Sequence, residues 1–301
     1  MIEKLEECKL CPRECKVNRL KGKIGFCGAT SNNIKIARAA LHYWEEPCIS
    51  GEVGSGTVFF SHCTLKCAFC QNFDISQCNY YGKEVTIERL AEIFLELQEK
   101  GALNINLVTP THYVYHIIEA LDIAKKKGLN LPVIYNTSGY EKVETIRLLK
   151  GYVDVYLPDF KYFNSNYSSK YSKAPKYFDY VKEAIKEMIN QVGEVTFDNN
   201  GIVKSGVIIR HLMLPGLLFD SKKIIDYIYK SFGDKVYISI MNQYTPLDNV
   251  KNYEEINRPL NPKHYDSLVD YALRIGVKNG FIQEEGTDKE SFIPLFTYEG
   301  V

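Results

Sequence analysis

The sequence predicts an α/β fold in which six βα units form a partial (β/α)6 TIM-like barrel behind a cysteine-rich N-terminal extension. Short β-branched runs alternate with helical periodicity from about Ser55 onward, which is typical of a parallel sheet covered by helices. The units occupy residues 56–242, and an eight-unit barrel of about 250 residues implies roughly 190 for six units. All nine cysteines fall in the first 78 residues, which sets the N-terminal segment apart. An open doubly wound sheet is the structural alternative.

Three segments are expected: a metal-binding extension over residues 1–50, the barrel over 51–285 and a C-terminal tail over 286–301. Strands are expected near residues 56–61, 103–108, 132–136, 153–157, 206–212 and 236–241. Apolar side chains at helical spacing predict covering helices over residues 87–97, 114–124 and 178–192. The stretch TFDNNGIVK contains Asn-Gly, which favours a tight turn, and predicts a hairpin before the fifth strand. In both architectures the functional site lies at the carboxyl ends of the strands.

Composition and charge narrow the classes of function. Lys+Arg and Asp+Glu both number 37, so no net field draws the molecule to nucleic acid or to an anionic membrane, and neither partner is expected. The N-terminal stretch MIEKLEECKL lacks a basic segment followed by an apolar core. No uninterrupted apolar run approaches the roughly eighteen residues of a membrane-spanning helix. A cytoplasmic protein is expected, in which clustered thiols usually bind metal.

The segment HCTLKCAFCQN places three cysteines directly after the first expected strand, with the spacing C-x3-C-x2-C: Cys63, Cys67 and Cys70. Four cysteines complete a zinc site or a cubane iron–sulfur cluster, whereas three leave one iron without a protein ligand. That iron is open to a substrate or cofactor, as the fourth position of a catalytic zinc site is. The alternatives are buried reduced cysteines and a zinc ion shared with His62, although adjacent His62 and Cys63 would have difficulty pointing at one ion.

A second set of cysteines precedes the barrel with the spacing C-x2-C-x3-C-x11-C: Cys8, Cys11, Cys15 and Cys27. Four thiolates fill a metal site completely, which fits a structural zinc or a closed second iron–sulfur cluster. Thiolate sets bind both, so both remain open. Such a site would order roughly fifty residues that carry few large apolar side chains. Cys48 and Cys78 are interpreted as lone buried or peripheral thiols.

The C-x3-C-x2-C loop resembles the radical S-adenosylmethionine (SAM) superfamily, and CAFCQN resembles its activating-enzyme branch. The resemblance to pyruvate formate-lyase activating enzyme-like proteins runs from CKLCPRECKVNRLKGKIGFCGA to ISIMNQYTP, through NINLVTPTHYV, VIYNTSGYE, VDVYLPDFKY and VIIRHLMLPG. It implies a radical SAM barrel and a 4Fe-4S cluster on Cys63, Cys67 and Cys70, whose remaining iron binds the amino and carboxylate groups of SAM. One electron would cleave SAM to methionine and a 5′-deoxyadenosyl radical, which would abstract hydrogen from a substrate.

The same resemblance implies partners and cofactor contacts. The partners are a reductant such as flavodoxin or ferredoxin, and a glycyl-radical protein or another substrate. Phe69, between two cysteine ligands, would pack near adenine. Relatives carry Gly-Gly-Glu after the second strand, for the methionine ammonium, where this chain has Thr109. They carry Asp-Thr after the third strand, where this chain has Asn136-Thr137, so two expected carboxylates are replaced.

Further matches with the family lie at the ends of the last three strands. In LPDFK, Asp159 would serve a cation or ribose site and Lys161 would contact the SAM carboxylate; an ordinary surface ion pair is the alternative. Arg210 and His211 close the fifth expected strand, and residues 242–244 close the sixth. These match positions near SAM or substrate, and a buried polar pair that satisfies loop backbone is the alternative for them.

Other classes of function remain open. A radical SAM enzyme can act on a small molecule or a peptide without a glycyl-radical partner. A non-catalytic zinc or iron–sulfur protein that interacts with RNA, or an assembly subunit that only carries electrons, would also explain two cysteine sets. The balanced charge and the lack of a Lys/Arg stripe weigh against RNA. A closed fourth ligand or a failure to bind SAM would favour the non-enzymatic classes.

Overall fold

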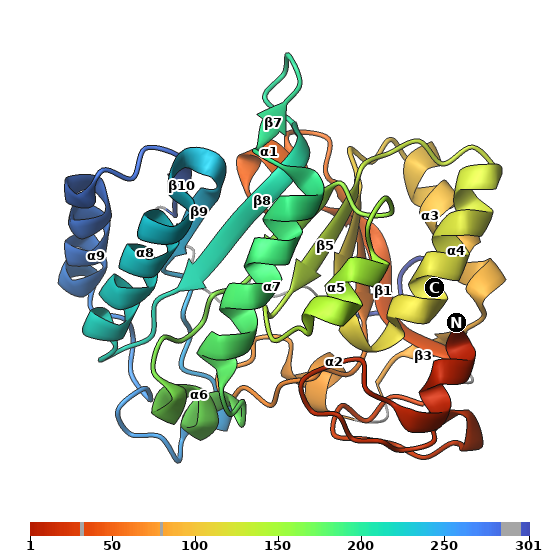
Figure 1. The fold of residues 1–301 in the computed structure, drawn as a ribbon, viewed down its shortest axis with the longest axis horizontal. Helices are drawn as coiled ribbons and strands as arrows, with labels where there is room; N and C mark the ends of the chain where they lie inside the picture. The colour runs from red at the N-terminus through yellow and green to blue at the C-terminus, as the bar shows by residue number, and fades with distance from the viewer. Residues whose placement is uncertain (31–32, 79–80, 284–295) are drawn as a thin grey trace.

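The computed structural model describes residues 1–30, 33–78, 81–283 and 296–301, and Figure 1 shows its strands gathered in one sheet. The strands are β1 (Ile34–His42), β2 (Ser55–Phe60), β3 (Lys83–Val85), β4 (Ile105–Val108), β5 (Val133–Thr137), β6 (Val155–Pro158), β7 (Thr196–Phe197), β8 (Val203–Leu212), β9 (Tyr237–Met241) and β10 (Gly280–Ile282). Their order is β10-β9-β8-β6-β5-β4-β2-β1-β3, and β7 pairs with β8 off this path.

The central pairs of this sheet are parallel. Strands β2, β4, β5, β6, β8, β9 and β10 run in one direction, whereas β1 is antiparallel to both β2 and β3. Among the described residues β10 does not pair with β3, so the sheet stays open. The predicted partial barrel of parallel strands is confirmed.

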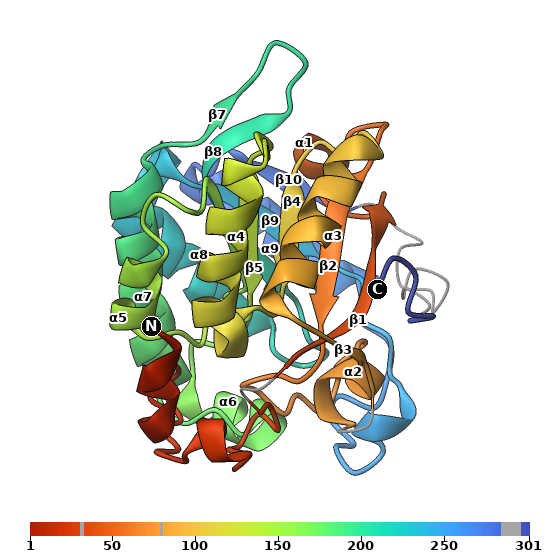
Figure 2. The ribbon, with the colours of Figure 1, turned by 90° about the vertical axis from the view of Figure 1, so that its right-hand side faces the viewer.

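Helices cover one face of the sheet, as Figures 1 and 2 show from two sides. The α-helices are α1 (Pro47–Ser50), α2 (Phe73–Gln77), α3 (Ile87–Glu99), α4 (Val114–Lys126), α5 (Val143–Leu148), α6 (Ser165–Ser172), α7 (Tyr177–Val192), α8 (Leu218–Phe232) and α9 (Pro262–Ile275). Short 3-10 helices are η1 (Ile2–Glu7), η2 (Arg19–Lys21), η3 (Thr111–Tyr113), η4 (Gly233–Lys235) and η5 (Asp248–Val250).

The covering helices follow from their sequences. In α3 the side chain of the N-cap residue Thr86 accepts a hydrogen bond from the Arg89 backbone N–H at 3.2 Å, which satisfies a donor that the helix leaves free. Its stripe of Leu90, Phe94 and Leu97 is buried. The same spacing predicts α4 and α7, and all three predicted helices are confirmed.

The six expected strands correspond to β2, β4, β5, β6, β8 and β9, and the expected hairpin is the pairing of β7 with β8, in which Phe197 faces Val203. Strands β1, β3 and β10 were not predicted. The three alanines of β1 favour strands weakly, and β3 and β10 have three residues each, which is too short for a periodic signal.

The N-terminal and C-terminal parts of the chain meet at β1. This strand lies inside the expected extension of residues 1–50 and pairs with β2. Residues 296–301 lie along it: the Ala39 backbone N–H donates to Glu299 O at 2.8 Å, and Arg38 Nη2 is 2.8 Å from Glu299 Oε2. Residues 286–295 of the expected tail lie outside the described residues. The segment boundaries at residues 50 and 285 stay predictions.

Candidate active site

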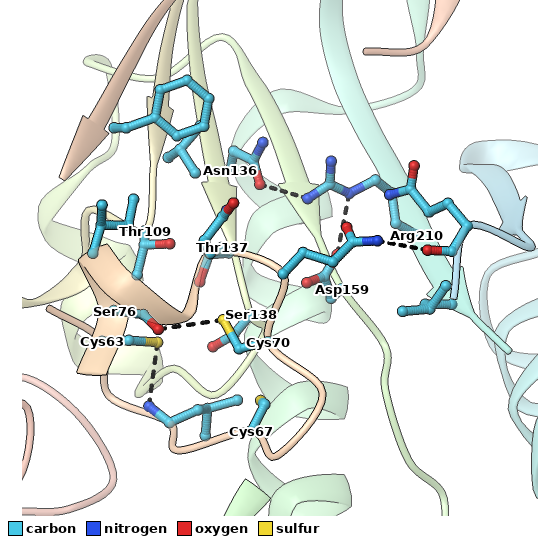
Figure 3. Close-up of a pocket in the computed structure, with 18 of the residues that line it drawn as sticks. Cys63, Cys67, Cys70, Ser76, Thr109, Asn136, Thr137, Ser138, Asp159 and Arg210 are labelled. Atoms are coloured by element: carbon cyan, nitrogen blue, oxygen red, sulfur yellow. Dashed lines mark hydrogen bonds and ion pairs between the residues drawn. The ribbon is translucent and has the colours of Figure 1, made fainter. Parts of the chain in front are cut away.

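A cavity of about 390 Å³ lies at the carboxyl ends of the parallel strands (Figure 3). It is lined by ten of the residues that the family resemblance places at the cluster or near SAM: Cys63, Cys67, Phe69, Cys70, Thr109, Asn136, Thr137, Asp159, Lys161 and Arg210. They come from β5 and β8 and from the loops after β2, β4 and β6. Parallel strands place their carboxyl ends at one edge of the sheet, which is why residues distant in sequence meet here.

The three cysteines lie in the loop after β2, and hydroxyl groups contact two of the sulfurs. Ser172 Oγ donates to Cys67 Sγ at 3.0 Å, and Ser76 Oγ lies 3.3 Å from Cys70 Sγ (Figure 3). Polar hydrogens of this kind stabilise a thiolate. Ser172 belongs to α6 and Ser76 to α2, so two helices outside the barrel repeat support the loop.

The third sulfur, that of Cys63, accepts a hydrogen bond from the Leu65 backbone N–H at 3.4 Å. Burial raises the pKa of Cys63 to about 12 and that of Cys67 to about 11, although the charge of Lys161 lowers the latter. Metal binding therefore has to release protons from these thiols. In the described part of the chain, no group of three or more His, Cys, Asp or Glu side chains is placed to hold a metal ion as the side chains stand.

The backbone is left-handed at the ends of two strands that border the cavity. His62 has φ of 76° after β2, and Thr109 has φ of 58° after β4. Non-glycine residues rarely adopt such angles, and those that do are concentrated at functional sites. The turn after β2 directs the chain into the cysteine loop. Burial lowers the pKa of His62 to about 4, so its ring is neutral beside Cys63.

A network of buried charges forms one wall of the cavity (Figure 3). Asp159 Oδ2 accepts from Lys161 Nζ at 2.7 Å, and Asp159 Oδ1 accepts from Arg210 Nε at 3.1 Å. Arg210 also donates to Glu45 Oε2 at 3.1 Å and to Asn136 Oδ1 at 2.6 Å. The network contains two carboxylates and two cations, so its charges balance. An exposed surface pair, the alternative for Asp159 and Lys161, is excluded by their burial, since both side chains are only 16% exposed.

Burial and pairing act in opposite directions on these groups. Burial by itself would raise the pKa of Asp159, but Lys161 and Arg210 hold that pKa below its ordinary value. Burial would lower the pKa of Lys161, but the carboxylate of Asp159 raises it above its ordinary value. Both members of the pair are therefore charged at neutral pH.

Glu45 is a cavity residue that the sequence analysis missed. It lies between β1 and α1, and its Oε1 accepts from Asn106 Nδ2 at 3.0 Å and from Asn136 Nδ2 at 3.3 Å. Its neighbour Glu46 is also buried, and burial raises the pKa of Glu46. The acidic pair in HYWEEP was the one signal available, and only the pairing of β1 with β2 brings it to the barrel.

Glu141 was missed as well. It is fully buried, accepts a hydrogen bond from Thr111 Oγ1 at 2.5 Å and accepts another from Thr137 Oγ1. Burial raises the pKa of Glu141 to about 7. Thr137 lines the cavity, so Glu141 fixes the orientation of a cavity hydroxyl from behind.

His211 and Tyr244, which were expected near SAM or substrate, make structural contacts instead. His211 does not line the cavity; its Nδ1 lies 2.8 Å from Phe160 O. Of residues 242–244, Gln243 lines the cavity, whereas Tyr244 packs at 6.3 Å from the Phe69 ring and donates to Ile256 O at 2.6 Å. For His211 and Tyr244 the contacts match the alternative of polar groups that satisfy backbone.

The remaining cysteines fall into two groups. The N-terminal set lines a separate cavity of about 20 Å³: Cys8, Cys11, Cys15 and Cys27. Cys48 is buried in the core and Cys78 is half-buried, and neither lines the two cavities described. All nine cysteines are free thiols.

An open parallel barrel with a three-cysteine loop at its carboxyl edge defines the class of this protein. The chain matches the family model described as the radical SAM superfamily over residues 57–228, which is more than half of its length. The chain therefore belongs to the radical SAM superfamily. The uncharacterized protein MJ0674 of Methanocaldococcus jannaschii is 34% identical over 278 residues, which cover 89% of this chain and 74% of that relative.

Solved structures share the fold at low identity. The FeFe-hydrogenase maturase HydG from Carboxydothermus hydrogenoformans has a TM-score of 0.51 and 15% identity, over 79% of this chain and 56% of that one. Streptococcus suis SuiB bound to SAM has a TM-score of 0.50 and 15% identity, over 75% and 49%. This chain thus spans about half of those proteins. A domain of pyruvate-formate lyase-activating enzyme from Bacteroides vulgatus has a TM-score of 0.40 and 12% identity, too weak to assign that subtype.

Superfamily membership supports an enzyme with SAM cleavage chemistry and implies a 4Fe-4S cluster and SAM as cofactors. The residues fit both groups, because three thiols, one buried and two half-buried, share one loop, and the ammonium group of Lys161 lines the same cavity. No helix in the described ranges has the length and apolar character needed to cross a membrane.

Proposed function

We propose that this protein cleaves SAM reductively at a 4Fe-4S cluster held by Cys63, Cys67 and Cys70, and uses the product radical to abstract hydrogen from a substrate. The observation that carries the proposal is that these three thiols and the buried pair Asp159–Lys161 line one cavity. When bound, the cluster supplies the electron that converts SAM to methionine and a 5′-deoxyadenosyl radical. Three protein ligands fit a cluster that leaves one iron for SAM.

Lys161 is the group best placed for the SAM carboxylate. It lines the same cavity as the three cysteines, and Asp159 Oδ2 accepts a hydrogen bond from its ammonium group at 2.7 Å. A carboxylate that arrives beside Lys161 exchanges hydration for a charge-assisted hydrogen bond. Because both oxygens of Asp159 are already paired with Lys161 and Arg210, we propose that Asp159 positions Lys161 rather than binding a free cation.

Glu45 can substitute for the two carboxylates that relatives carry at the positions of Thr109 and Asn136. Thr109 and Asn136 stand where relatives carry acids, and Glu45 reaches the side chain of Asn136 from outside the barrel repeat. We propose that amide and hydroxyl oxygens together with Glu45 supply the negative end of the cavity. Phe69, which packs near Tyr162 and Tyr244 at the cavity wall, offers an apolar surface for adenine.

The substrate approaches from the side where aromatic residues are exposed. Tyr43 and Trp44 line the cavity and are 50% and 63% exposed, and exposed aromatic residues are typical of surfaces that receive a partner. This supports a polypeptide substrate, for which we propose a glycyl residue of a partner enzyme, with flavodoxin or ferredoxin as reductant. The second candidate is a small molecule or a peptide outside any glycyl-radical enzyme, since a 390 Å³ cavity also admits small ligands.

Electron paramagnetic resonance of the anaerobically reconstituted and reduced protein tests SAM binding. The cluster signal should change when SAM is added to the wild type and to the control variant Cys78→Ser, because Cys78 lines neither cavity. A cluster signal that is insensitive to SAM would favour a subunit that only carries electrons. Adding a candidate glycyl-radical protein with SAM should then produce a glycyl radical signal, whereas hydrogen abstraction from a deuterated small molecule alone would favour the second candidate.

A further inference from the structure

The first thirty residues contain little regular structure, yet they are held tightly against the barrel. Their only described helices are the short η1 and η2. Arg19 is fully buried and donates to His112 O at 2.7 Å and to Thr30 O at 2.6 Å, and Thr145 Oγ1 donates to Leu10 O at 2.6 Å. A segment of this kind usually requires an additional source of order, such as a bound metal.

The cysteines of this segment surround one small space. The cavity of about 20 Å³ is lined by all four of them: Cys8, Cys11, Cys15 and Cys27. His112 lines it too and is 2% exposed, and its Nδ1 has no hydrogen-bond partner among the described residues.

The backbone is arranged to approach the sulfurs closely. The Phe26 N–H donates to Cys15 Sγ at 3.3 Å, and the Ala29 N–H donates to Cys27 Sγ at 3.4 Å. A Cβ atom at Gly25 would stand 2.9 Å from Cys15 Sγ, so only glycine allows this approach. Backbone N–H groups directed at sulfur stabilise thiolates, which are the form that binds metal.

The turn that carries Cys15 is strained. Glu14 and Lys16, on either side of it, have φ of 41° and 54°, left-handed values that are uncommon for residues other than glycine. Such strain persists where the surrounding structure holds the backbone in place, and it is concentrated at ligand-binding sites. Here it turns the Cys15 side chain toward the same cavity as the other three thiols.

We propose that Cys8, Cys11, Cys15 and Cys27 bind a single zinc ion as a closed four-thiolate site. A cavity of about 20 Å³ has room for about one water-sized body, which suits a single ion. Because no described group stands in ligand geometry, the four side chains have to rotate about their Cα–Cβ bonds as they close on the ion. Four thiolates leave no open coordination position, so the site is structural.

The ion would also steady the catalytic loop. Arg13 lies in the turn between Cys11 and Cys15, and its Nε donates to Thr64 O at 3.0 Å, inside the loop that carries the three catalytic cysteines. Its guanidinium stacks at 3.7 Å from the Phe26 ring. Fixing Cys11 and Cys15 fixes the position of Arg13, and Arg13 holds the loop backbone next to Cys63.

Zinc, iron and sulfide analysis of the anaerobically purified full-length chain tests this site without any SAM chemistry. The wild type and the control Cys78→Ser should contain about one zinc per chain in addition to the iron of the catalytic cluster. Cys11→Ser/Cys27→Ser should lose the zinc, keep the iron and release that iron faster to a chelator. Cys63→Ser/Cys67→Ser/Cys70→Ser should lose the iron and keep the zinc, so a failure here and a failure of the proposed function are distinguishable.

Zinc that is absent from the wild type, or that persists in Cys11→Ser/Cys27→Ser, would overturn the proposal. So would about twice the iron of one cubane in the wild type, which would indicate a second cluster. If Cys11→Ser/Cys27→Ser does not fold, cobalt binding to Cys63→Ser/Cys67→Ser/Cys70→Ser tests whether the N-terminal cysteines bind a metal ion. The absorption of a tetrahedral four-thiolate cobalt centre is expected, and its absence would refute the site.

Discussion

Arg210 and Glu45 form a buried ion pair, Nη1 to Oε2 at 3.1 Å, that joins β8 to the segment following β1. Their side chains are 14% and 9% exposed, so water replaces neither partner easily. The pair connects the antiparallel strand outside the βα repeat to the charge network that lines the cavity.

Replacing Glu45 with Gln should destabilise the protein and weaken SAM binding. The change removes a charged acceptor from Arg210, and hydrogen bonds to charged groups contribute about 1.5–3 kcal/mol. Urea unfolding measures the loss. The control Glu183→Gln, on an exposed Glu183–Lys186 pair, should change stability little, because surface ion pairs contribute at most about 1 kcal/mol. Equal losses in the two variants would show that the buried pair has no special importance.

Lys161→Ala should lower the affinity for SAM by about ten- to a hundredfold, which corresponds to roughly 1.5–3 kcal/mol for a charged hydrogen bond. Asp159→Asn should weaken binding less, because it leaves the ammonium group present but poorly positioned. Calorimetric titration of SAM into the anaerobic variants measures both. The control Lys182→Ala removes an ion-paired lysine of α7 that lies outside the cavity. If it binds SAM as weakly as Lys161→Ala, the assignment of Lys161 is wrong.

Gly139→Ala should damage the site through the backbone. A Cβ atom there would stand 2.3 Å from Asp159 O, and φ is +74°. Gly151, with φ of +82° and nothing within 4 Å of such a Cβ atom, is the matched control. Alanine is strained by the left-handed backbone at both positions. Gly139→Ala should lower the free energy of unfolding by about 1–3 kcal/mol more than Gly151→Ala, because its Cβ atom overpacks the site. It should also weaken SAM binding. Identical melting temperatures would contradict the close approach of Gly139 to Asp159.

The stability of the protein should decrease as the pH falls through the range in which histidine titrates. Burial lowers the pKa of His211 from 6.5 to about 4, so between these values the unfolded chain binds a proton that the folded chain does not. Lowering the pH from 7.5 to 5 therefore lowers the free energy of unfolding, by about 2 kcal/mol for this group. Urea unfolding of His211→Gln should show a shallower dependence on pH. A variant of the exposed His264 should behave as the wild type does.

The parts of the fold and of the site that belong to the βα repeat could be predicted from the sequence. Thr109, Asn136 and Asp159 each follow or end a parallel strand, so strand periodicity alone places them at one edge of the sheet. Glu45 and Glu141 were missed because they reach the site by other routes. Glu45 reaches the site through the pairing of β1 with β2, whereas Glu141 approaches Thr137 from the loop between β5 and α5. Glu141 has no local sequence signal for a cavity, and the only signal for Glu45 was the acidic pair in HYWEEP.

The cysteine loop was the strongest signal, because its spacing and its place after β2 both follow from consecutive residues. The serines that contact its sulfurs could not be predicted in this way. Ser172 lies in α6, more than a hundred residues away in sequence from Cys67. Contacts of this kind depend on how α6 packs against the cysteine loop, which no periodic pattern specifies.

The formation of 5′-deoxyadenosine tests the assignment of the catalytic cluster most directly. Wild-type protein, reconstituted anaerobically and supplied with SAM and a reductant, should release 5′-deoxyadenosine and methionine in equal amounts. Cys63→Ala/Cys67→Ala/Cys70→Ala should release neither, while circular dichroism shows a retained fold and zinc analysis shows an unchanged N-terminal site. Reductive SAM cleavage by the triple variant at the wild-type rate would contradict the role of these three cysteines.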